Sequence, residues 1–381
     1  MPGVVLDLAI KVIPSDQRIW VVFPGKGRKF LAQFLSERII FVDTPGIRLD
    51  GEILEDALLG NARRLRQHIA MSVTIANYHN GHTETLPSRQ YSAYRAARGN
   101  VVGLVETMFI DMKPRDLILI SGKSMYAPFY IGEITKPFDP GEDVTQVSPY
   151  GRDEIPYRKV KWLPIGRPER RFLPERLYQL LSNEKAVISI SRADFGELIF
   201  RYAYGDYVFG ENSRYVYHAP NYDNRGEETI PGLQLISYFA AAYHANAQHK
   251  INEFAALSIR DAIRAFSAKE DLYSFEIDFH SPGSYILHAK KAAIPLVVAL
   301  LVSATSGSLS FAAAQSAEIE NSAAVIQAVP GEADYDDGLV PISEQFHGIV
   351  EGMGAARFNE MVKLNKDAQQ GPGLQVGVKQ K

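Results

Sequence analysis

The chain contains no cysteine among its 381 residues and only two tryptophans. The absence of cysteine excludes a disulfide framework, a thiolate metal site and a cysteine nucleophile. Residues Met1 to Pro14 combine apolar side chains with Asp7 and Lys11, and they lack the basic start and the small-residue cleavage site of a secretory signal. We therefore expect a cytoplasmic protein.

Several sequence motifs of catalysis are also missing. The chain has no Gly-x-Ser-x-Gly nucleophile turn, no His-Glu-x-x-His zinc motif and no dinucleotide-binding glycine pattern. An acidic strand at Glu276–Asp278 is followed by His280, where a metal-dependent nuclease site of the Asp-x-Lys pattern would carry lysine. His79, His82 and Glu84 lie close together in a polar loop, but a metal site needs further ligands. We therefore predict no catalytic residue, metal or cofactor, and we favour a protein that is not an enzyme.

The charge of the chain is small in total but uneven along it. Basic residues outnumber acidic ones by 27 to 21 in residues 1–192, whereas residues 193–381 hold 14 basic and 23 acidic residues, so the formal net charge is −3. A basic first half fits a surface that contacts phosphates, although an excess of this size over so long a segment is also ordinary. The acidic second half is a poor candidate for contact with nucleic acid. Length and an apolar share of 46% allow two or three packed domains.

An ordered series of strands and turns occupies the first half of the chain. Trp20 opens an apolar strand that runs into a basic glycine loop, Pro24–Lys29. A turn and a second strand follow at Met112–Ile120, and two further strands are expected at Tyr130–Ile134 and Tyr157–Leu163. Short strands with few helices predict a partly open β-barrel.

This order resembles the EVE/PUA-like domain, in the version found at the N-terminus of Mrr-type modification-dependent restriction proteins. The resemblance covers residues 17–192. It implies a small mixed barrel that binds DNA or RNA, often by holding a flipped-out base, which includes modified bases. The family turn usually carries glycine before aspartate, whereas this chain has Arg115 before Asp116.

A base-reading barrel needs aromatic rings for stacking, polar groups for the base edge and cations for the flanking phosphates. Strand tryptophans are also common in cores, and the glycine loop could be a simple connector that binds nothing. It lacks the spacing and ending of a Walker A loop, which makes nucleotide hydrolysis there unexpected. The predicted nucleic-acid-binding residues are Trp20, Phe23, Lys26, Arg28, Lys29, Ser121, Lys123, Ser124, Tyr126, Tyr130, Arg158, Lys161 and Trp162.

The second half predicts a separate α+β module at residues 193–330. The spacing of apolar residues predicts one long amphipathic helix over Leu233–Phe266. The segment 292–314 has no charged residue, so its length allows membrane contact, while its serines and threonine equally fit a buried helix or helical hairpin. Residues 331–381 are expected to form a flexible tail.

Together these features predict an α+β protein with a PUA/EVE-like mixed β-barrel at residues 1–192. The favoured function is a nucleic-acid sensor coupled to a non-catalytic effector or oligomerisation module in antiviral defence. Such a protein could form a homo-oligomer and reach a membrane through residues 292–314 on activation. The alternatives are a modification-dependent restriction nuclease with an unrecognised metal site, and a scaffold that uses the barrel to bind a protein.

Overall fold

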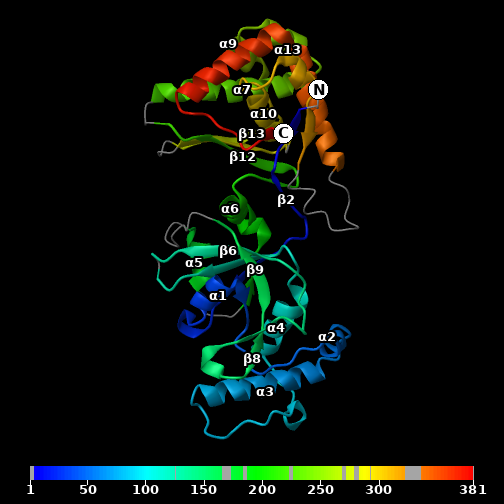
Figure 1. The fold of residues 1–381 in the computed structure, drawn as a ribbon, viewed down its shortest axis with the longest axis vertical. Coiled ribbons are helices and arrows are strands. Elements are labelled where there is room, and N and C mark those ends of the chain that lie inside the picture. The colour runs from blue at the N-terminus through cyan, green and yellow to red at the C-terminus, as the bar shows by residue number, and fades with distance from the viewer. Residues whose placement is uncertain are drawn as a thin grey trace. The chain divides into compact units, whose positions relative to one another are not determined.

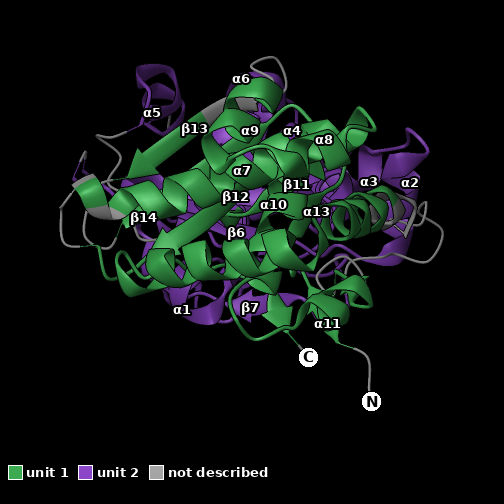
Figure 2. Cartoon of the chain, turned by 90° about the horizontal axis from the view of Figure 1, so that it is seen from above, with its two compact units in different colours: residues 1–15, 204–381 green, residues 16–203 purple. Residues whose placement is uncertain are grey.

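The computed structural model describes residues 4–124, 126–164, 173–182, 187–222, 226–267, 272–278, 283–291, 293–321 and 336–380. The chain divides into two units, which Figure 2 colours separately. Unit 2 comprises residues 16–203, and unit 1 comprises residues 1–15 and 204–381. Both units mix helices with mostly antiparallel strands, so the expected α+β class is confirmed at the level of class.

Unit 2 is built on a six-stranded curled sheet with the order β10-β3-β5-β6-β9-β4. Strands β3 and β5 are parallel, and the other neighbours are antiparallel. Every residue of β3 and β5 is buried, because both are apolar runs that helices and loops cover. The strands of this unit are β3 (Ile19–Val22), β4 (Ile39–Ile40), β5 (Leu117–Ser121), β6 (Phe129–Ile134), β7 (Val144–Gln146), β8 (Glu154–Pro156), β9 (Arg158–Trp162) and β10 (Val187–Ser189).

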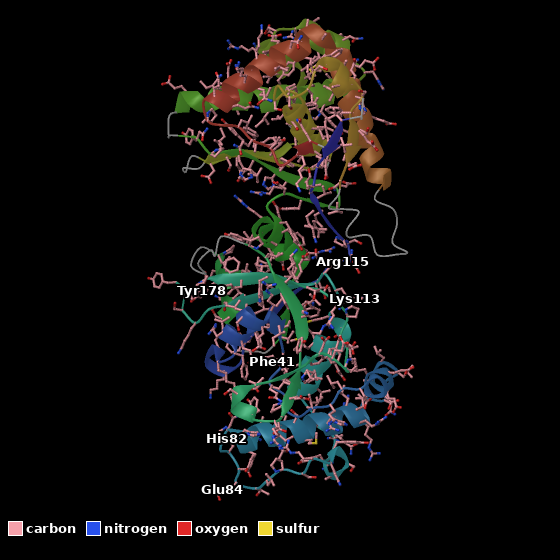
Figure 3. The ribbon with its side chains drawn as sticks, viewed as in Figure 1. Phe41, His82, Glu84, Lys113, Arg115 and Tyr178 are labelled. Carbon is pink, nitrogen blue, oxygen red and sulfur yellow. The ribbon has the colours of Figure 1, made fainter. Side chains whose placement is uncertain are left out.

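Helices of unit 2 pack around this sheet and around a separate hairpin of β7 and β8. Asp50 caps α2 by accepting a hydrogen bond from the backbone N–H of Ile53. Phe41, labelled in Figure 3, packs in the core with its ring 5.0 Å from Phe30 and 4.8 Å from Phe34. The helices are α1 (Leu31–Glu37), α2 (Gly51–Leu58), α3 (Arg63–His79), α4 (Asn100–Glu106), α5 (Glu175–Ser182) and α6 (Arg192–Tyr204), with short helical turns η1 (Lys26–Arg28), η2 (Tyr91–Ala93), η3 (Thr107–Asp111) and η4 (Ser148–Tyr150).

Unit 1 contains a five-stranded sheet of order β13-β14-β12-β11-β2 and a three-stranded sheet of order β15-β1-β16. Helices α7, α10 and α13 pack together above the larger sheet (Figure 1). The strands are β1 (Val5–Asp7), β2 (Lys11–Ile13), β11 (Tyr207–Phe209), β12 (Asn212–Ala219), β13 (Leu272–Asp278), β14 (Gly283–Ala289), β15 (Glu318–Glu320) and β16 (Lys379–Gln380). The helices are α7 (Ile230–Ala247), α8 (Ile251–Ala256), α9 (Ile259–Phe266), α10 (Ala293–Ala304), α11 (Phe311–Gln315) and α13 (Asp336–Gln370), with the short turn η6 (Gly226–Thr229).

The domain boundaries differ from the prediction at both ends of the barrel segment. The first 15 residues belong to unit 1, because β1 pairs with β15 and β16 while β2 pairs with β11. At the other end, unit 2 extends beyond residue 192 and includes most of α6. Unit 2 is therefore inserted between the second and eleventh strands of the chain.

The single long helix predicted over Leu233–Phe266 is wrong. The chain instead forms α7, α8 and α9, which are separated by turns at His249 and Ser258. His249 has a φ of 56°, a left-handed conformation that ends the first helix, and Ser258 caps α9. Helix α7 is buried on most of its circumference, so it is a core helix rather than an amphipathic surface helix.

The apolar segment predicted at residues 292–314 forms helix α10, a turn and helix α11; Ala292 itself lies outside the described residues. Every residue of α10 from Ile294 to Ala304 is buried in the core of unit 1. This confirms the buried-helix alternative. Among the described helices, none is both long and apolar enough to cross a bilayer.

The flexible tail predicted at residues 331–381 is also wrong for the residues that the structure describes. Helix α13 packs against α7, α10 and α11, and buries Phe346, Ile349 and Val350 in the core. Beyond it, Leu374 is buried and β16 pairs with β1. The segment is held because it carries apolar side chains that the rest of unit 1 covers. Residues 331–335 lie outside the described residues.

Candidate nucleic-acid interface

The parallel pairing of β3 and β5 brings two predicted loops together. Trp20 lies opposite Ile118 and Val21 opposite Leu119, so the carboxyl ends of both strands lie at the same edge of the sheet. The glycine loop follows the first strand, and residues 122–126 follow the second. Parallel strands place their following loops side by side in this way.

Arg28 joins the two loops. Its Nε donates a hydrogen bond of 2.9 Å to the carbonyl oxygen of Ser121, and its guanidinium lies 3.3 Å from the Ser121 Oγ. The same guanidinium lies over the ring of Phe23, 4.9 Å from its centroid. Phe23 and Arg28 thus form one cluster with Ser121, which lies 93 residues beyond Arg28 in the sequence. Residues Arg28 and Ser121 are therefore structural links in this loop pair.

The glycine loop is a tight turn that exposes its tip. Gly25 has a φ of 74°, and a Cβ there would lie 2.7 Å from the ring of Phe30, so the position requires glycine. The N–H of Arg28 donates to the carbonyl of Gly25, which closes the turn. Lys26 at the tip and Lys123 in the neighbouring loop are exposed. Within the described part of the chain, neither lysine has a hydrogen-bond or ion-pair partner.

Tyr126 and Ser124 complete the exposed part of this edge. The side chain of Tyr126 is one of the few large apolar groups that lie open to solvent, with 62% of its surface exposed. Ser124 is exposed, and Tyr130 is half-buried in β6. We call the surface made by Lys26, Lys123, Ser124 and Tyr126 the loop face.

Lys161 and Trp162 lie on β9, next to β6. Lys161 is exposed and pairs across the sheet with Glu133. Trp162 lies opposite Gly132, and its ring approaches so closely that a Cβ on Gly132 would lie 2.7 Å from it. The indole N–H of Trp162 donates to the carbonyl of Phe34 at 3.0 Å. The ring is thus half-buried and held against α1.

Four of the predicted binding residues have buried side chains. Trp20 is only 6% exposed, and Phe23 lies under Arg28. The buried Ser121 Oγ donates to the carbonyl of Leu181 at 3.0 Å. The prediction that these side chains contact a ligand is contradicted by their burial in this structure, which leaves no open ring face or free hydroxyl. Arg158 is the fourth case.

Arg158 is a core residue rather than a phosphate contact. It is 1% exposed, and its guanidinium donates to the carbonyls of Met108, Met112 and Lys136 at 2.9–3.2 Å. Desolvation lowers its pKa to about 10. Its neighbour Val160, two residues along the strand, is also buried, while Lys159 between them is exposed. The alternation of β9 is therefore the sequence signal that could have placed Arg158 inside.

Lys29 is held in an ion pair within unit 2. Its Nζ lies 2.9 Å from the Asp43 carboxylate and donates to the Tyr150 hydroxyl at 2.9 Å. Burial alone would lower the pKa of Lys29, but the bonds to Tyr150 and Asp43 outweigh burial and raise it. Lys29 therefore carries a charge that Asp43 already balances, and the prediction of a free phosphate-binding cation is wrong here.

The turn before β5 is hydrogen-bonded to strand β3. Arg115 has a φ of 75°, in the left-handed region that favours glycine, and lies with Lys113 on the turn labelled in Figure 3. Asp116 follows and accepts hydrogen bonds from the indole N–H of Trp20 at 2.9 Å and from the backbone N–H groups of Arg18 and Lys113 at 3.0 Å. One carboxylate thus ties the turn to the neighbouring strand.

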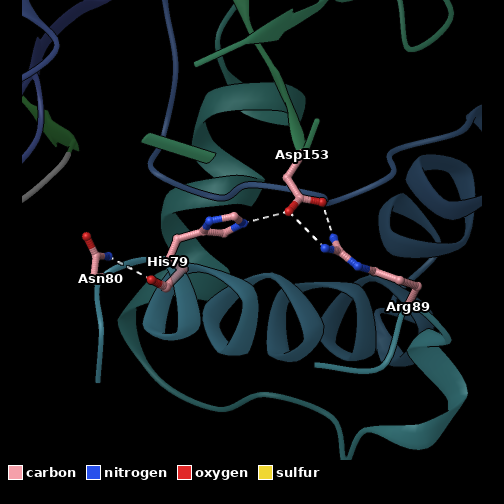
Figure 4. A network of polar contacts seen from close by, with 5 residues as sticks. His79, Asn80, Arg89 and Asp153 are labelled. Atoms are coloured by element: carbon pink, nitrogen blue, oxygen red, sulfur yellow. Dashed lines mark hydrogen bonds and ion pairs between the residues drawn. The ribbon is translucent and has the colours of Figure 1, made fainter. Parts of the chain in front are cut away.

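His79, the last residue of α3, belongs to a polar network with Asp153 and Arg89. His79 Nε2 lies 2.8 Å from the Asp153 carboxylate, which also accepts hydrogen bonds from Nη1 and Nη2 of Arg89 (Figure 4). His82 and Glu84 lie further along the exposed loop (Figure 3). Across the described residues, no group of three or more metal-binding side chains comes together.

No family model, curated protein or solved structure matches this chain. Function is therefore inferred from the residues and their geometry.

Proposed function

We propose that unit 2 binds nucleic acid through the loop face. The observation that carries the proposal is the contact between Arg28 and Ser121, because it holds the glycine loop against the loop that follows β5. Two exposed lysines without partners among the described residues and one exposed tyrosine then share one edge of a rigid sheet. A nucleic-acid strand could place its phosphates beside Lys26 and Lys123 and stack a base on Tyr126.

The turn geometry agrees with the EVE/PUA-like resemblance. Arg115 occupies the position where the family usually carries glycine, and its backbone has the left-handed conformation that glycine favours. The bond from Trp20 to Asp116 joins two of the motifs on which the resemblance rests. A PUA/EVE-like barrel that reads a flipped or modified base remains the binding mode that the resemblance implies.

In this proposal, unit 1 is the effector or association module. Acidic residues predominate in its sequence, so it is a poor surface for phosphates. The same proposal includes homo-oligomer formation through unit 1. It also includes a role in antiviral defence, by analogy with modification-dependent restriction proteins. Cleavage of modified DNA by the purified protein with Mg²⁺ would instead support the nuclease alternative.

Binding of labelled single-stranded and double-stranded oligonucleotides, with and without modified bases, tests the proposal. The double variant Lys26→Ala/Lys123→Ala should weaken binding to most sequences alike, by about tenfold or more, since it removes two phosphate contacts. Tyr126→Ala should lose about 1–3 kcal/mol of binding free energy if the ring stacks on a base. The matched control is Arg63→Ala/Arg66→Ala, which removes the same charge from exposed positions of α3. Equal affinities for wild type and the lysine variant would contradict the proposal.

A further inference from the structure

A second basic site lies away from the loop face, in an open groove of about 1280 Å³. Its walls are the segment 46–51, helix α3, the segment 89–92 around η2, and the hairpin of β7 and β8. None of its lining residues belongs to the loop face. The volume is enough for a ligand of nucleotide size.

Four arginines line the groove, each from a different wall. They are Arg48, Arg64, Arg89 and Arg152. Arg89 is paired with Asp153, and Arg64 lies 3.4 Å and 3.6 Å from carboxylate oxygens of α2. Arg48 and Arg152 are exposed, and no residue in the described ranges pairs with either of them. Two guanidinium groups are thus available to an anion, and their planar donor sets match phosphate oxygens.

Two of the three acidic residues that line the groove already accept hydrogen bonds from the protein. Asp153 accepts from Arg89 and His79, and the Asp50 side chain caps α2. Glu154 lies on the rim, where its side chain is exposed. The unpaired cations of the groove are therefore Arg48 and Arg152, and the exposed carboxylates in its lining are Asp50 and Glu154.

An aromatic pair forms part of the wall. The rings of His68 and Tyr91 are stacked, with centroids 4.2 Å apart and planes inclined by 22°. His68 is buried, and this burial lowers its pKa, so the imidazole is neutral at physiological pH. It supports Tyr91 as a packing partner rather than as a cation. Tyr91 is half-buried and lines the groove, where a planar ring could stack on it.

The groove is held in shape before any ligand arrives. Asp153 joins the hairpin to Arg89 and to His79 at the end of α3 (Figure 4). The N–H of Gly46 donates to the carbonyl of Glu154 at 2.7 Å, which ties the segment 46–51 to β8. Gly46 has a φ of 69°, and a Cβ there would lie 2.8 Å from the end of the Ile75 side chain, so a larger residue would strain the backbone and displace Ile75. Preorganised walls reduce the cost of ordering on binding.

We propose that this groove binds a free nucleotide, with its phosphates on Arg48 and Arg152 and its base against Tyr91. The proposal is independent of nucleic-acid binding at the loop face. Unit 2 would then bind a small phosphorylated ligand in the groove, in addition to nucleic acid at the loop face.

Titration calorimetry of the full chain with ATP, GTP and inorganic pyrophosphate tests the proposal. All three should bind, and the variant Arg48→Gln/Arg152→Gln should weaken each by about tenfold or more. Tyr91→Leu should weaken the two nucleotides and leave pyrophosphate unchanged, because only the nucleotides carry a base. The control Arg63→Gln/Arg66→Gln makes the same charge change beside the groove and should bind as wild type does.

Three outcomes would overturn the proposal. One is the absence of binding by every probe at millimolar concentration, and another is equal weakening in the variant and its control. The third is binding of an oligonucleotide that Arg48→Gln/Arg152→Gln abolishes while free nucleotides never bind, which would assign the groove to the strand. Failure of the loop face would appear separately, as unchanged oligonucleotide binding in the lysine variant. Both arginines are exposed and unpaired within the described ranges, and unfolding followed by tryptophan fluorescence verifies that the variants fold.

Discussion

The indole N–H of Trp20 donates a 2.9 Å hydrogen bond to the carboxylate of Asp116, which lies 96 residues further along the chain. Both groups are buried, and the same carboxylate accepts from the backbone of Arg18 and Lys113. A buried donor without an acceptor is costly, so this contact fixes β3 in register beside β5. It therefore sets the position of the glycine loop relative to the loop after β5.

Asp116→Ala should lower the free energy of unfolding of unit 2 by about 2–4 kcal/mol, because it leaves the buried indole N–H unpaired. Asp116→Asn keeps one carbonyl acceptor and should cost less. Both tryptophans of the chain lie in residues 16–203, so urea denaturation followed by tryptophan fluorescence reports unit 2 within the full protein. A loss below about 0.5 kcal/mol for the alanine variant would mean that the contact is not structural.

Arg115→Gly should stabilise unit 2 by about 0.5–1 kcal/mol. The left-handed conformation is strained for arginine, and relief of that strain exceeds the extra entropy of glycine in the unfolded chain. Arg115→Ala is the matched control, since it removes the side chain and keeps the strain. Stabilisation by alanine equal to that by glycine would attribute the effect to the side chain instead.

The contribution of Asp153 should depend on pH. Burial would raise the pKa of this carboxyl, but hydrogen bonds from Arg89 and His79 outweigh burial and lower the pKa below its usual value of 3.8. A lowered pKa means that the stabilisation is present above the unfolded pKa and is lost as the pH falls through the folded one. Asp153→Asn should therefore destabilise unit 2 at pH 7, and the difference from wild type should shrink below pH 3.8. A difference that is the same at pH 3 and pH 7 would contradict this assignment.

Phe346→Ala tests the correction of the predicted tail. Phe346 is fully buried in the core of unit 1, so its truncation should cost about 3–5 kcal/mol there. The expected result is an earlier unfolding transition by circular dichroism with an unchanged transition by tryptophan fluorescence, since unit 1 contains no tryptophan. An unchanged circular dichroism transition would mean that α13 does not stabilise unit 1, as the prediction of a flexible tail requires.

The sequence predicted the strands of unit 2 better than the roles of their side chains. Apolar runs and turn residues placed β3, β5, β6 and β9 near their observed positions, because these signals are local. The burial of Trp20 depends on which layers cover the sheet, and that information is not local. Arg158 is buried because three carbonyls from segments more than 20 residues away converge on it.

Long-range pairing also explains the errors in unit 1. Strand β1 pairs with Glu318–Glu320, and α13 packs against α7 about a hundred residues upstream, so neither terminus shows its partner in its own sequence. No local sequence signal indicates the groove, for the same reason. Its four arginines lie at positions 48, 64, 89 and 152, with no common motif.

Salt dependence of oligonucleotide binding tests nucleic-acid recognition by the loop face most directly. For the full chain, the logarithm of the binding constant should fall linearly with the logarithm of salt concentration between about 50 and 200 mM, because bound phosphates release counterions. Lys26→Ala/Lys123→Ala should weaken binding and reduce this slope by about 2, or about 1 for each lost phosphate contact. Arg63→Ala/Arg66→Ala should keep the wild-type slope. Identical slopes for wild type and the lysine variant, or binding that salt does not change, would contradict the claim.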